Sequence, residues 1–205
     1  MAVTSWNPQT TAIVCVECQN GVLGSDSVLP ALAADSADLV TSLARLLEAA
    51  RDFGARVVHA TYEGSFGGTP TGTARLWRTL APATAGWTPG DSATTVLPEL
   101  FAPTDLVLPR HHGLFPTLDS ELLPVLKGLG VTTIVLTGVS LNLAITHTAG
   151  HVTQAGFDLV VPRDGVGGTP ASYAKQVLDN TIAVLGRLVT VDQLVDEWRA
   201  LQGGR

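Results

Sequence analysis

Short apolar runs alternate with stretches of helical periodicity along most of the chain, and this alternation constrains the fold more than any other feature. Thr11 to Cys18 is an apolar, β-branched run that ends at the turn-forming Gln19–Gly21, as expected of a buried parallel strand. From Leu32 to Ala50, apolar residues recur every three or four positions, and Gly54 then closes a predicted helix before a second strand, Arg56 to Thr61. One β-α-β unit is therefore predicted.

The alternation continues to the carboxyl end. Further strands are predicted at Leu106–Leu108, Thr132–Thr137, Asp158–Pro162 and Leu188–Thr190. Further helices are predicted at Ala74–Leu80, Ser120–Lys127, Leu141–Gln154, Pro170–Leu185 and Val191–Leu201. We expect a single α/β domain over residues 1–205, with three layers (α/β/α) around a central, mostly parallel six-stranded sheet. The Gly- and Pro-rich segment Tyr62 to Pro103 is too long for a plain connector and is predicted to cover a pocket.

Charge and hydropathy narrow the class of partner. The chain has 12 Lys and Arg residues against 18 Asp and Glu, a formal net charge of −6 with neutral histidine. The basic residues are scattered, so the chain lacks the basic patch of a protein that binds nucleic acid or an anionic membrane surface. No apolar run approaches the ~20 residues of a membrane helix, and Met1 to Thr10 lacks the features of a signal peptide. We expect a cytoplasmic protein that binds a small molecule.

The two cysteines, Cys15 and Cys18, lie three positions apart in the first predicted strand. Neighbouring side chains of a strand point to opposite faces, so we expect these two to face apart, without a disulfide bond between them. Their spacing does not indicate zinc.

Ligands of open parallel sheets bind outside the carboxyl ends of the strands. Four segments lie at such ends: Glu17 after strand one, His59 to Glu63 after strand two, Pro109 to His112 after strand three and Gly138 to Asn142 after strand four. We expect the functional site where these segments meet.

Three strings of the sequence belong together: Ala12 to Asn20 (AIVCVECQN), Val135 to Ala144 (VLTGVSLNLA) and Gly156 to Asp164 (GFDLVVPRD). In combination they resemble the isochorismatase-like, or cysteine hydrolase, superfamily. Members carry an acidic residue followed by x-Gln-Asn after strand one, a lysine after strand three, and a cysteine at the start of the helix after strand four. The resemblance covers most of the chain. It implies a Rossmann-like three-layer fold, a homodimer or homotetramer, and hydrolysis of an amide such as nicotinamide or of the vinyl ether of isochorismate.

This chain departs from the family pattern at all three catalytic positions. Glu17 stands where the family has Asp; it keeps a carboxylate on a longer stem, so acid/base chemistry remains available. The lysine position falls in Pro109–Gly113, where either Arg110 or His111 is its equivalent. An arginine stays charged and offers a planar fork, so Arg110 would orient a carboxylate or stabilise charge rather than shuttle protons.

At the position of the family cysteine, the chain has Ala144. A methyl group cannot attack a carbonyl, so thiolate addition is excluded at this position. The alanine is either native to a branch without the cysteine or a deliberate substitution, and the departures at Glu17 and at Arg110 to His112 favour the native branch. Cys18, beside Glu17, is an alternative nucleophile, but strand alternation predicts that it points into a helix-packing layer.

Isochorismate hydrolases of the same superfamily also lack the cysteine, and they indicate what chemistry such a site supports. Glu17 would protonate the vinyl carbon, water would add to the resulting cation, and Arg110 would hold a substrate carboxylate. Backbone amides at the start of the helix from Leu141 would cradle an anionic group. Family members often have a non-proline cis peptide just before this helix, which Val139–Ser140 would match.

Other residues at the same edge are candidates for substrate binding. They are Gln19, His112, Ser140, Asn142 and Trp77. Asn142 is equally explained as a helix cap, and Trp77 as a packing residue together with Trp87. The metal-binding branch of the superfamily has an Asp-x-His run and a further histidine after strand two, where this chain reads His59 to Glu63, so we expect no metal and no cofactor.

Two classes of function follow. The first is a small-molecule hydrolase that uses acid/base chemistry from Glu17, with Arg110 and a histidine of the His111–His112 pair; the bond cleaved is a vinyl ether or an amide attacked by activated water. The second is a catalytically silent relative that binds a metabolite or a protein partner. Glu17 beside an empty, polar pocket would favour the enzyme, whereas an Arg110 fork that fills the pocket would favour the silent relative.

Overall fold

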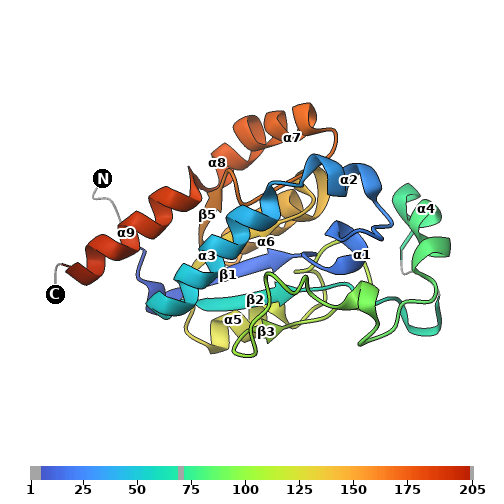
Figure 1. Ribbon diagram of the computed structural model, residues 1–205, viewed down its shortest axis with the longest axis horizontal. Coiled ribbons are helices and arrows are strands. Elements are labelled where there is room, and N and C mark those ends of the chain that lie inside the picture. The colour runs from blue at the N-terminus through green and yellow to red at the C-terminus, as the bar shows by residue number, and fades with distance from the viewer. Residues whose placement is uncertain (1–5, 69–71, 204–205) are drawn as a thin grey trace.

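The computed structural model describes residues 6–68 and 72–203. Its centre is a six-stranded sheet with the strand order β3-β2-β1-β4-β5-β6, and all neighbouring strands pair in parallel. The order reverses between β1 and β4, and the strands of Figure 1 point towards the side where α1, α2 and α4 gather. The predicted α/β fold with a six-stranded, mostly parallel sheet is confirmed. Such a reversal opens a crevice at the carboxyl ends of the strands.

The strands are β1 (Thr11–Val16), β2 (Arg56–Ala60), β3 (Leu106–Val107), β4 (Thr133–Gly138), β5 (Asp158–Pro162) and β6 (Arg187–Val189). The helices are α1 (Asn20–Leu23), α2 (Pro30–Asp35), α3 (Leu39–Phe53), α4 (Arg75–Thr84), α5 (Leu122–Gly128), α6 (Thr146–Gln154), α7 (Ala171–Val177), α8 (Ala183–Leu185) and α9 (Val191–Gly203). Short helical turns are η1 (Pro8–Thr10), η2 (Phe66–Gly68), η3 (Ser92–Thr94), η4 (Leu141–Ile145) and η5 (Leu178–Ile182).

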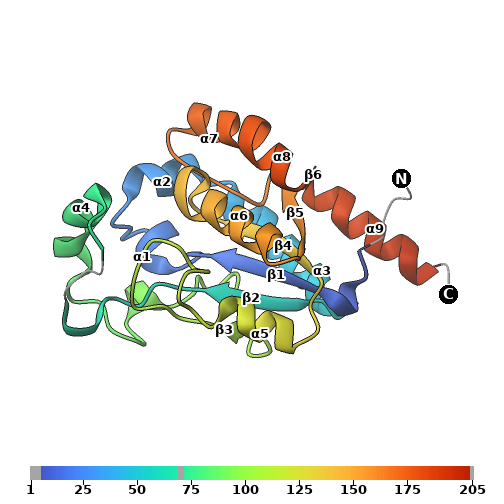
Figure 2. The same ribbon diagram turned by 180° about the vertical axis from the view of Figure 1, so that it is seen from behind.

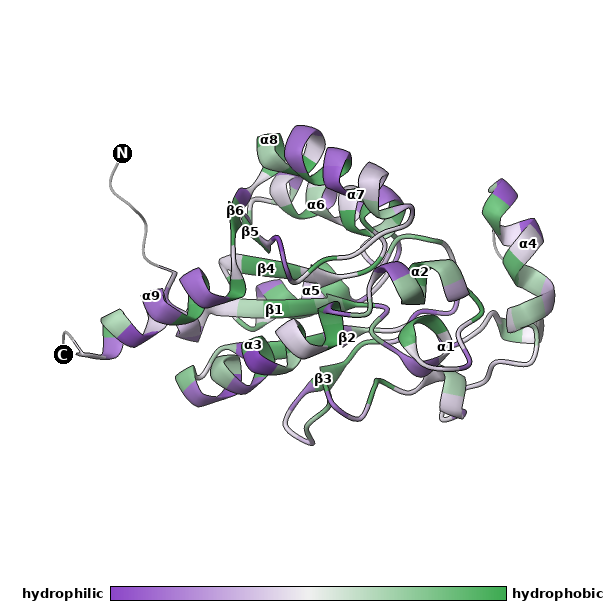
Figure 3. Ribbon diagram, turned by 45° about the horizontal axis from the view of Figure 1, so that its top comes forward, coloured by the Kyte–Doolittle hydropathy of each residue, from purple (hydrophilic) through white to green (hydrophobic). Residues whose placement is uncertain are grey.

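Helices cover both faces of the sheet (Figures 1 and 2). Ile13 of β1 packs in a core with α3 and α9, whereas Val14 and Val16 pack on the other face with α5 and α6. The central strands are therefore mostly hydrophobic, while the helices carry hydrophilic residues on their outer sides (Figure 3). This burial explains why the strands have continuous apolar runs and the helices have periodic ones.

The prediction of one helix from Leu32 to Ala50 is wrong, because this segment forms two helices, α2 and α3. Ser36 ends α2 with φ −113° and ψ 18°, and α3 begins at Leu39. The side chain of Ser36 lies against Gly167, where an added Cβ would come within 2.9 Å of the Ser36 Cβ. The break thus fits α2 against the segment that follows β5. The predicted helices at 141–154 and 170–185 are present; the first begins with a π-helical turn, and the second is interrupted by one.

The prediction that Cys15 and Cys18 face opposite ways is also wrong. Both thiols are free and buried in the core that includes α3 and α9. The reason lies in Glu17, whose φ of 53° is left-handed, so the alternation of side chains ends with β1 at Val16. Cys18 consequently returns to the face of the sheet that Cys15 occupies.

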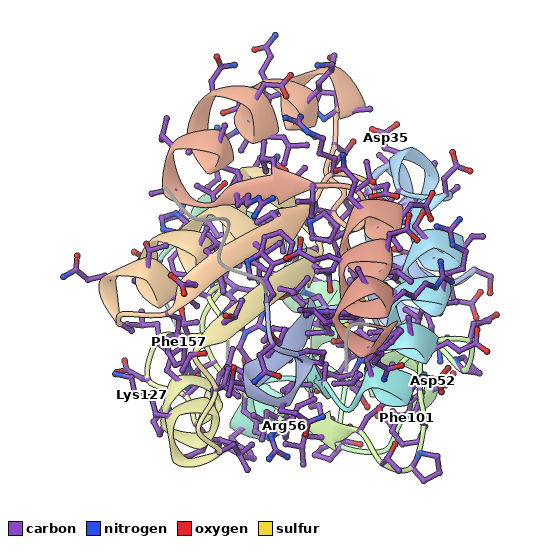
Figure 4. The ribbon with its side chains drawn as sticks, turned by 90° about the vertical axis from the view of Figure 1, so that its left-hand side faces the viewer. Asp35, Asp52, Arg56, Phe101, Lys127 and Phe157 are labelled. Atoms are coloured by element: carbon purple, nitrogen blue, oxygen red, sulfur yellow. The ribbon has the colours of Figure 1, made fainter. Side chains whose placement is uncertain are left out.

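The amino ends of the strands form the opposite end of the molecule (Figure 4). Asp52 and Arg56 are exposed there, and the Lys127 ammonium lies 5.8 Å from the ring centroid of Phe157. Within residues 6–68 and 72–203, no helix is long and apolar enough to cross a membrane. Met1–Ser5, part of the segment inspected for a signal peptide, lies outside the described residues.

Candidate active site

The candidate site begins with Glu17, the residue that follows β1. Its backbone N–H donates to the carbonyl of Ala60 at 3.0 Å, so the residue is still tied to β2 while its left-handed φ turns the chain. A left-handed φ is uncommon for a residue with a Cβ, and such residues concentrate at functional sites. The turn directs the carboxylate into a cavity at the carboxyl edge of the sheet.

Arg110 forms an ion pair with Glu17 through Nη2 and Oε1; their side chains are 3% and 17% exposed. The same guanidinium donates to the carbonyl of Gly113 from Nε at 3.3 Å and to the carbonyl of Thr61 from Nη1 at 3.5 Å. These contacts hold the planar guanidinium group in one position, and a guanidinium stays charged. Of the two candidates for the lysine position, Arg110 is therefore the residue that contacts the carboxylate.

A small cavity of about 60 Å³ adjoins this pair, and its lining is mostly apolar. Its walls come from residues 22–32 after β1, from residues 76–87 in and after α4, and from Leu114, Leu143 and Ala144. The predicted role of the Tyr62–Pro103 segment as a pocket cover thus agrees with the position of α4 (Figure 1). The cavity favours a ligand with an apolar body and a polar end that faces Glu17.

Aromatic rings line one side of the cavity. The ring of Tyr62 lies 5.3 Å from that of Trp77 and 6.0 Å from that of Trp87, in tilted arrangements. The Arg110 guanidinium carbon lies 5.4 Å from the Tyr62 ring centroid. Both tryptophans considered at the sequence level therefore reach the cavity. Tyr62 links them to the Glu17–Arg110 pair.

The start of η4 also contributes to the cavity lining. The peptide between Val139 and Ser140 is cis, as the family resemblance implied, and Ser140 and Ala144 both line the cavity. Asn142 does not line it: its Nδ2 donates to the carbonyl of Thr169 at 3.1 Å. Among the described residues that line the cavity there is no cysteine, histidine or lysine.

Gln19, a predicted substrate-binding residue, is fully buried outside the cavity. Its Nε2 donates to the carbonyls of Tyr62 and Ala93, and its Oε1 accepts from the N–H of Tyr62. These bonds occupy both amide protons and one lone pair of the carbonyl. Gln19 therefore joins backbone segments around the cavity rather than presenting its amide to it.

His111 and His112 are also placed outside this cavity. Nδ1 of His111 lies 3.0 Å from the carbonyl of Gly64, and its ring stacks on Phe66 at 4.2 Å between centroids. Nε2 of His112 lies 2.8 Å from the carbonyl of Asp119. Both histidines line a neighbouring surface depression that includes Arg110 but neither Glu17 nor Ala144. The structure thus separates them from the carboxylate to which the sequence analysis assigned them.

The described residues contain no group of three or more His, Cys, Asp or Glu side chains that could hold a metal ion. His147 and His151, which have the spacing of metal ligands on α6, contact other partners. The ring of His147 packs on Phe115 with 4.0 Å between centroids, and Nδ1 of His151 lies 2.6 Å from the hydroxyl of Thr117.

A buried polar chain runs beside the site, on the face of the sheet covered by α3. Cys15 of β1 is in register with His59 of β2, whose Nε2 lies 3.1 Å from Oδ2 of Asp105. Arg51 of α3 donates to both oxygens of Asp105, at 3.0 and 2.6 Å. On the other side, the hydroxyl of Thr137 donates to Sγ of Cys15 at 3.4 Å.

These buried polar residues perturb one another's protonation. The interaction with the Cys18 thiol, aided by His59, outweighs burial and holds the pKa of Cys15 well below its ordinary value. The interaction with Cys15, together with burial, raises the pKa of Cys18. Burial opposes charge on His59, but Cys15 and Asp105 outweigh it and raise the pKa of His59. Burial is likewise outweighed at Asp105, where hydrogen bonds from Arg51 and a backbone N–H lower the pKa of the carboxyl.

The sequence analysis missed part of the cavity lining. Tyr62 was noted only as part of the segment after strand two, and Leu29 and Leu143 were not considered. A signal was present for Leu29, since Val22, Val28 and Leu29 form an apolar group in the stretch between the first strand and the next helix, where a plain loop would be polar.

Comparison with known proteins identifies the family and the fold. A family model described as the isochorismatase domain matches residues 11–193. An uncharacterized isochorismatase family protein of Escherichia coli O157:H7, YecD, is 28% identical over 90 residues, which cover 44% of this chain and 47% of that protein. The match thus spans about half the length of this curated relative.

Solved structures share the fold over most of their length. A cysteine hydrolase from Pseudomonas syringae pv. phaseolicola 1448A aligns with a TM-score of 0.80 and 18% identity, covering 96% of this chain and 95% of that one. An isochorismatase family protein from Burkholderia thailandensis aligns with a TM-score of 0.77 and 23% identity, covering 95% of this chain and 98% of that one. N-carbamoylsarcosine amidase from Thermoplasma acidophilum aligns with a TM-score of 0.70 and 20% identity, covering 89% of this chain and 97% of that one. At these identities the likeness concerns the fold alone.

Proposed function

This chain belongs to the isochorismatase family, and we propose that it hydrolyses a small metabolite by acid/base chemistry from Glu17, without a cysteine nucleophile. The bond is a vinyl ether or a C–N bond. The supporting observation is the Glu17–Arg110 ion pair at one end of an apolar cavity whose lining includes Ala144. The carboxylate is partly exposed to this cavity, while the arginine behind it is almost completely buried.

A purely structural role for the pair explains the geometry less well. A buried ion pair is seldom more stabilising than apolar residues of the same volume, because both charges lose their hydration. Glu17 also adopts a left-handed backbone conformation that turns its carboxylate towards the cavity. A structural carboxylate needs no such turn.

The proposed chemistry requires one group that gains and loses a proton beside the substrate. For a vinyl ether, protonated Glu17 donates a proton to the vinyl carbon, water adds to the cation, and the hemiketal collapses with release of the second product. For a C–N bond, ionised Glu17 removes a proton from water as the water attacks the carbonyl, and the protonated Glu17 then gives this proton to the departing nitrogen as the C–N bond breaks. In both cases Arg110 orients the carboxylate and stabilises its charged form. Ser140 adds a hydroxyl-bearing residue to the lining.

A second candidate is a catalytically silent member of the family that binds a metabolite or a protein partner. Two observations favour it. The cavity beside Glu17 has a mostly apolar lining, whereas a polar pocket was expected for the enzyme. In addition, Arg110 is held by Glu17, Thr61 and Gly113, so a substrate carboxylate would have to compete with Glu17 for the guanidinium group. Loss of turnover together with retained ligand binding would identify this class.

The test compares wild-type protein with Glu17→Gln on isochorismate and on a panel of small primary amides. We expect the variant to lose turnover by about 10²–10⁴-fold, the usual contribution of a general acid or base. Glu63→Gln is the matched control, because Glu63 lies at the same edge but does not line the cavity. If neither wild type nor variant consumes any substrate while a ligand still raises the melting temperature, the silent class replaces the hydrolase.

Three further proposals concern the whole protein. From the sequence and the family resemblance, we propose one domain over residues 1–205, a homodimer or homotetramer, and a cytoplasmic location. Light scattering of purified protein tests the assembly, and a monomer would contradict it.

A further inference from the structure

Cys15 and Cys18 enclose Glu17 in a Cys-Val-Glu-Cys sequence, and they are the chain's two cysteines. The left-handed turn at Glu17 brings both side chains into one buried core. The Cys18 thiol donates to the carbonyl of Val16 at 3.6 Å, and the Thr137 hydroxyl donates to Sγ of Cys15 at 3.4 Å. The candidate catalytic carboxylate therefore lies on the backbone segment that joins two neighbouring thiols.

His59 is placed to activate one of these thiols. It is in register with Cys15, and its Nε2 bonds to Asp105, while its buried Nδ1 has no hydrogen-bond partner among the described residues. An imidazole oriented by a carboxylate is the arrangement that favours a neighbouring thiolate. The lowered pKa of Cys15 and the raised pKa of His59 agree with this arrangement. The proposed hydrolysis uses none of these groups.

We propose that Cys15 and Cys18 are a redox modification site, at which a reversible disulfide bond fixes the turn that carries Glu17. Both thiols are buried, so the oxidant must be about as small as water, and hydrogen peroxide meets this need. The Cys15 thiolate attacks one peroxide oxygen, and the departing hydroxide takes a proton to become water. The Cys18 thiol then attacks the sulfenic sulfur and releases a second water. Two thiols thus lose two electrons and two protons, which reduce one peroxide to two waters.

The bond would act on the candidate site through the backbone. Its formation breaks the contact of Cys18 with the Val16 carbonyl and draws residues 15 and 18 together, with Glu17 between them. Since a disulfide fixes its two Cα atoms within about 7 Å, the turn that carries Glu17 loses freedom. The expected consequence is a fall in activity that a dithiol reductant reverses; this consequence rests on the proposed function.

Mass spectrometry of peroxide-treated native protein tests the site directly. After alkylation of free thiols under denaturing conditions, we expect the wild type to have lost two hydrogen atoms and to carry no alkyl group, and dithiothreitol to restore two alkylation sites. Because Cys18→Ser cannot form the bond, its Cys15 sulfenic acid should be trapped by dimedone. Covalent dimers, added oxygen without a disulfide, or unreacted thiols in the folded wild type would each overturn the proposal.

Two variants test the role of His59 as a positioning residue. In His59→Asn, and in Asp105→Asn if the first does not fold, the rate of disulfide formation at neutral pH should fall about tenfold for each unit by which the thiol pKa comes to lie above the assay pH. The rate should also increase more steeply with pH than in the wild type, a change that loss of packing alone would not produce. Wild-type rates and pH profiles in a folded variant would refute the activation by His59. A disulfide that forms in a protein without any hydrolytic activity would reject the proposed function while leaving the redox site intact.

Discussion

The side-chain amide of Gln19 binds both backbone groups of Tyr62: it donates to the carbonyl and accepts from the N–H, each at 2.8 Å. A third bond runs to the carbonyl of Ala93 at 3.1 Å. One buried side chain thereby joins the turn after β1, the loop after β2 and the segment after α4. Since all three segments contribute to the cavity, Gln19 positions its walls.

Replacing Gln19 by Met is expected to lower the free energy of unfolding by about 2–4 kcal/mol. The variant leaves backbone groups of Tyr62 and Ala93 buried without partners, and each such group costs about 1–3 kcal/mol. Urea unfolding followed by tryptophan fluorescence measures the change. Gln9→Met is the control, because exposed Gln9 has one side-chain bond, to the Phe53 carbonyl, and should change stability by less than about 0.5 kcal/mol. Equal losses in the two variants would contradict the role assigned to Gln19.

The charges of Glu17 and Arg110 cancel at the end of the cavity, so the wild type is expected to prefer benzamide to benzoate or benzamidine. Glu17→Gln frees the Arg110 fork and should bind benzoate about tenfold more tightly than the wild type, since a charge-assisted hydrogen bond contributes about 1.5–3 kcal/mol. Arg110→Gln should instead gain affinity for benzamidine. Calorimetric titration of the three ligands measures these preferences.

The double variant Glu17→Gln/Arg110→Gln is the control for this charge selection. It is neutral and should return to a preference for benzamide. A benzoate affinity that is the same in the wild type and in Glu17→Gln would show that ligands do not reach the pair.

Asp105→Asn is expected to destabilise the fold by about 3–5 kcal/mol near neutral pH, because it breaks a buried ion pair with Arg51 and the contact with His59. The pKa of Asp105 is lowered by folding, so its contribution is complete above the ordinary carboxyl value of 3.8 and is lost as the pH falls through the lower folded value. The difference between wild type and variant should therefore narrow below about pH 4. Urea unfolding at a series of pH values measures it, with the exposed Asp52→Asn as control; a constant difference would disprove the linkage.

Local patterns were sufficient for most of the fold. The strand predicted at Asp158–Pro162 has those bounds in the structure, because a continuous apolar run identifies a strand buried on both faces. The break at Ser36 could not be predicted, since it depends on a contact with Gly167, far away in the sequence. Propensity gives no information about such a contact.

The sequence predicts which strand ends carry the site, but not the direction of every side chain there. Glu17 follows β1 and Arg110 follows β3, the two strands that flank β2, so both residues were expected at the same edge of the sheet. The directions of Cys18 and Gln19 instead depend on the left-handed φ of Glu17, which no sequence pattern indicated. His111 leaves the cavity because Arg110 lies in an extended segment paired with Tyr62, and consecutive side chains there point opposite ways. The same alternation that failed beyond Val16 therefore holds at Arg110.

Gly138 and Gly150 are expected to respond in opposite ways to replacement by alanine. At Gly138, which ends β4 with φ 95°, an added Cβ would overlap the carbonyl of Val16 and lie 3.0 Å from Sγ of Cys18. Gly138→Ala should therefore cost about 3 kcal/mol or more, because both the backbone conformation and the space oppose it. At Gly150 in α6, no atom outside the helix backbone lies within 4 Å of an added Cβ, so Gly150→Ala should add about 0.5–1 kcal/mol. Urea unfolding of both variants measures these effects, and a stable Gly138→Ala protein would mean that β1 and β4 are farther apart at the site than described.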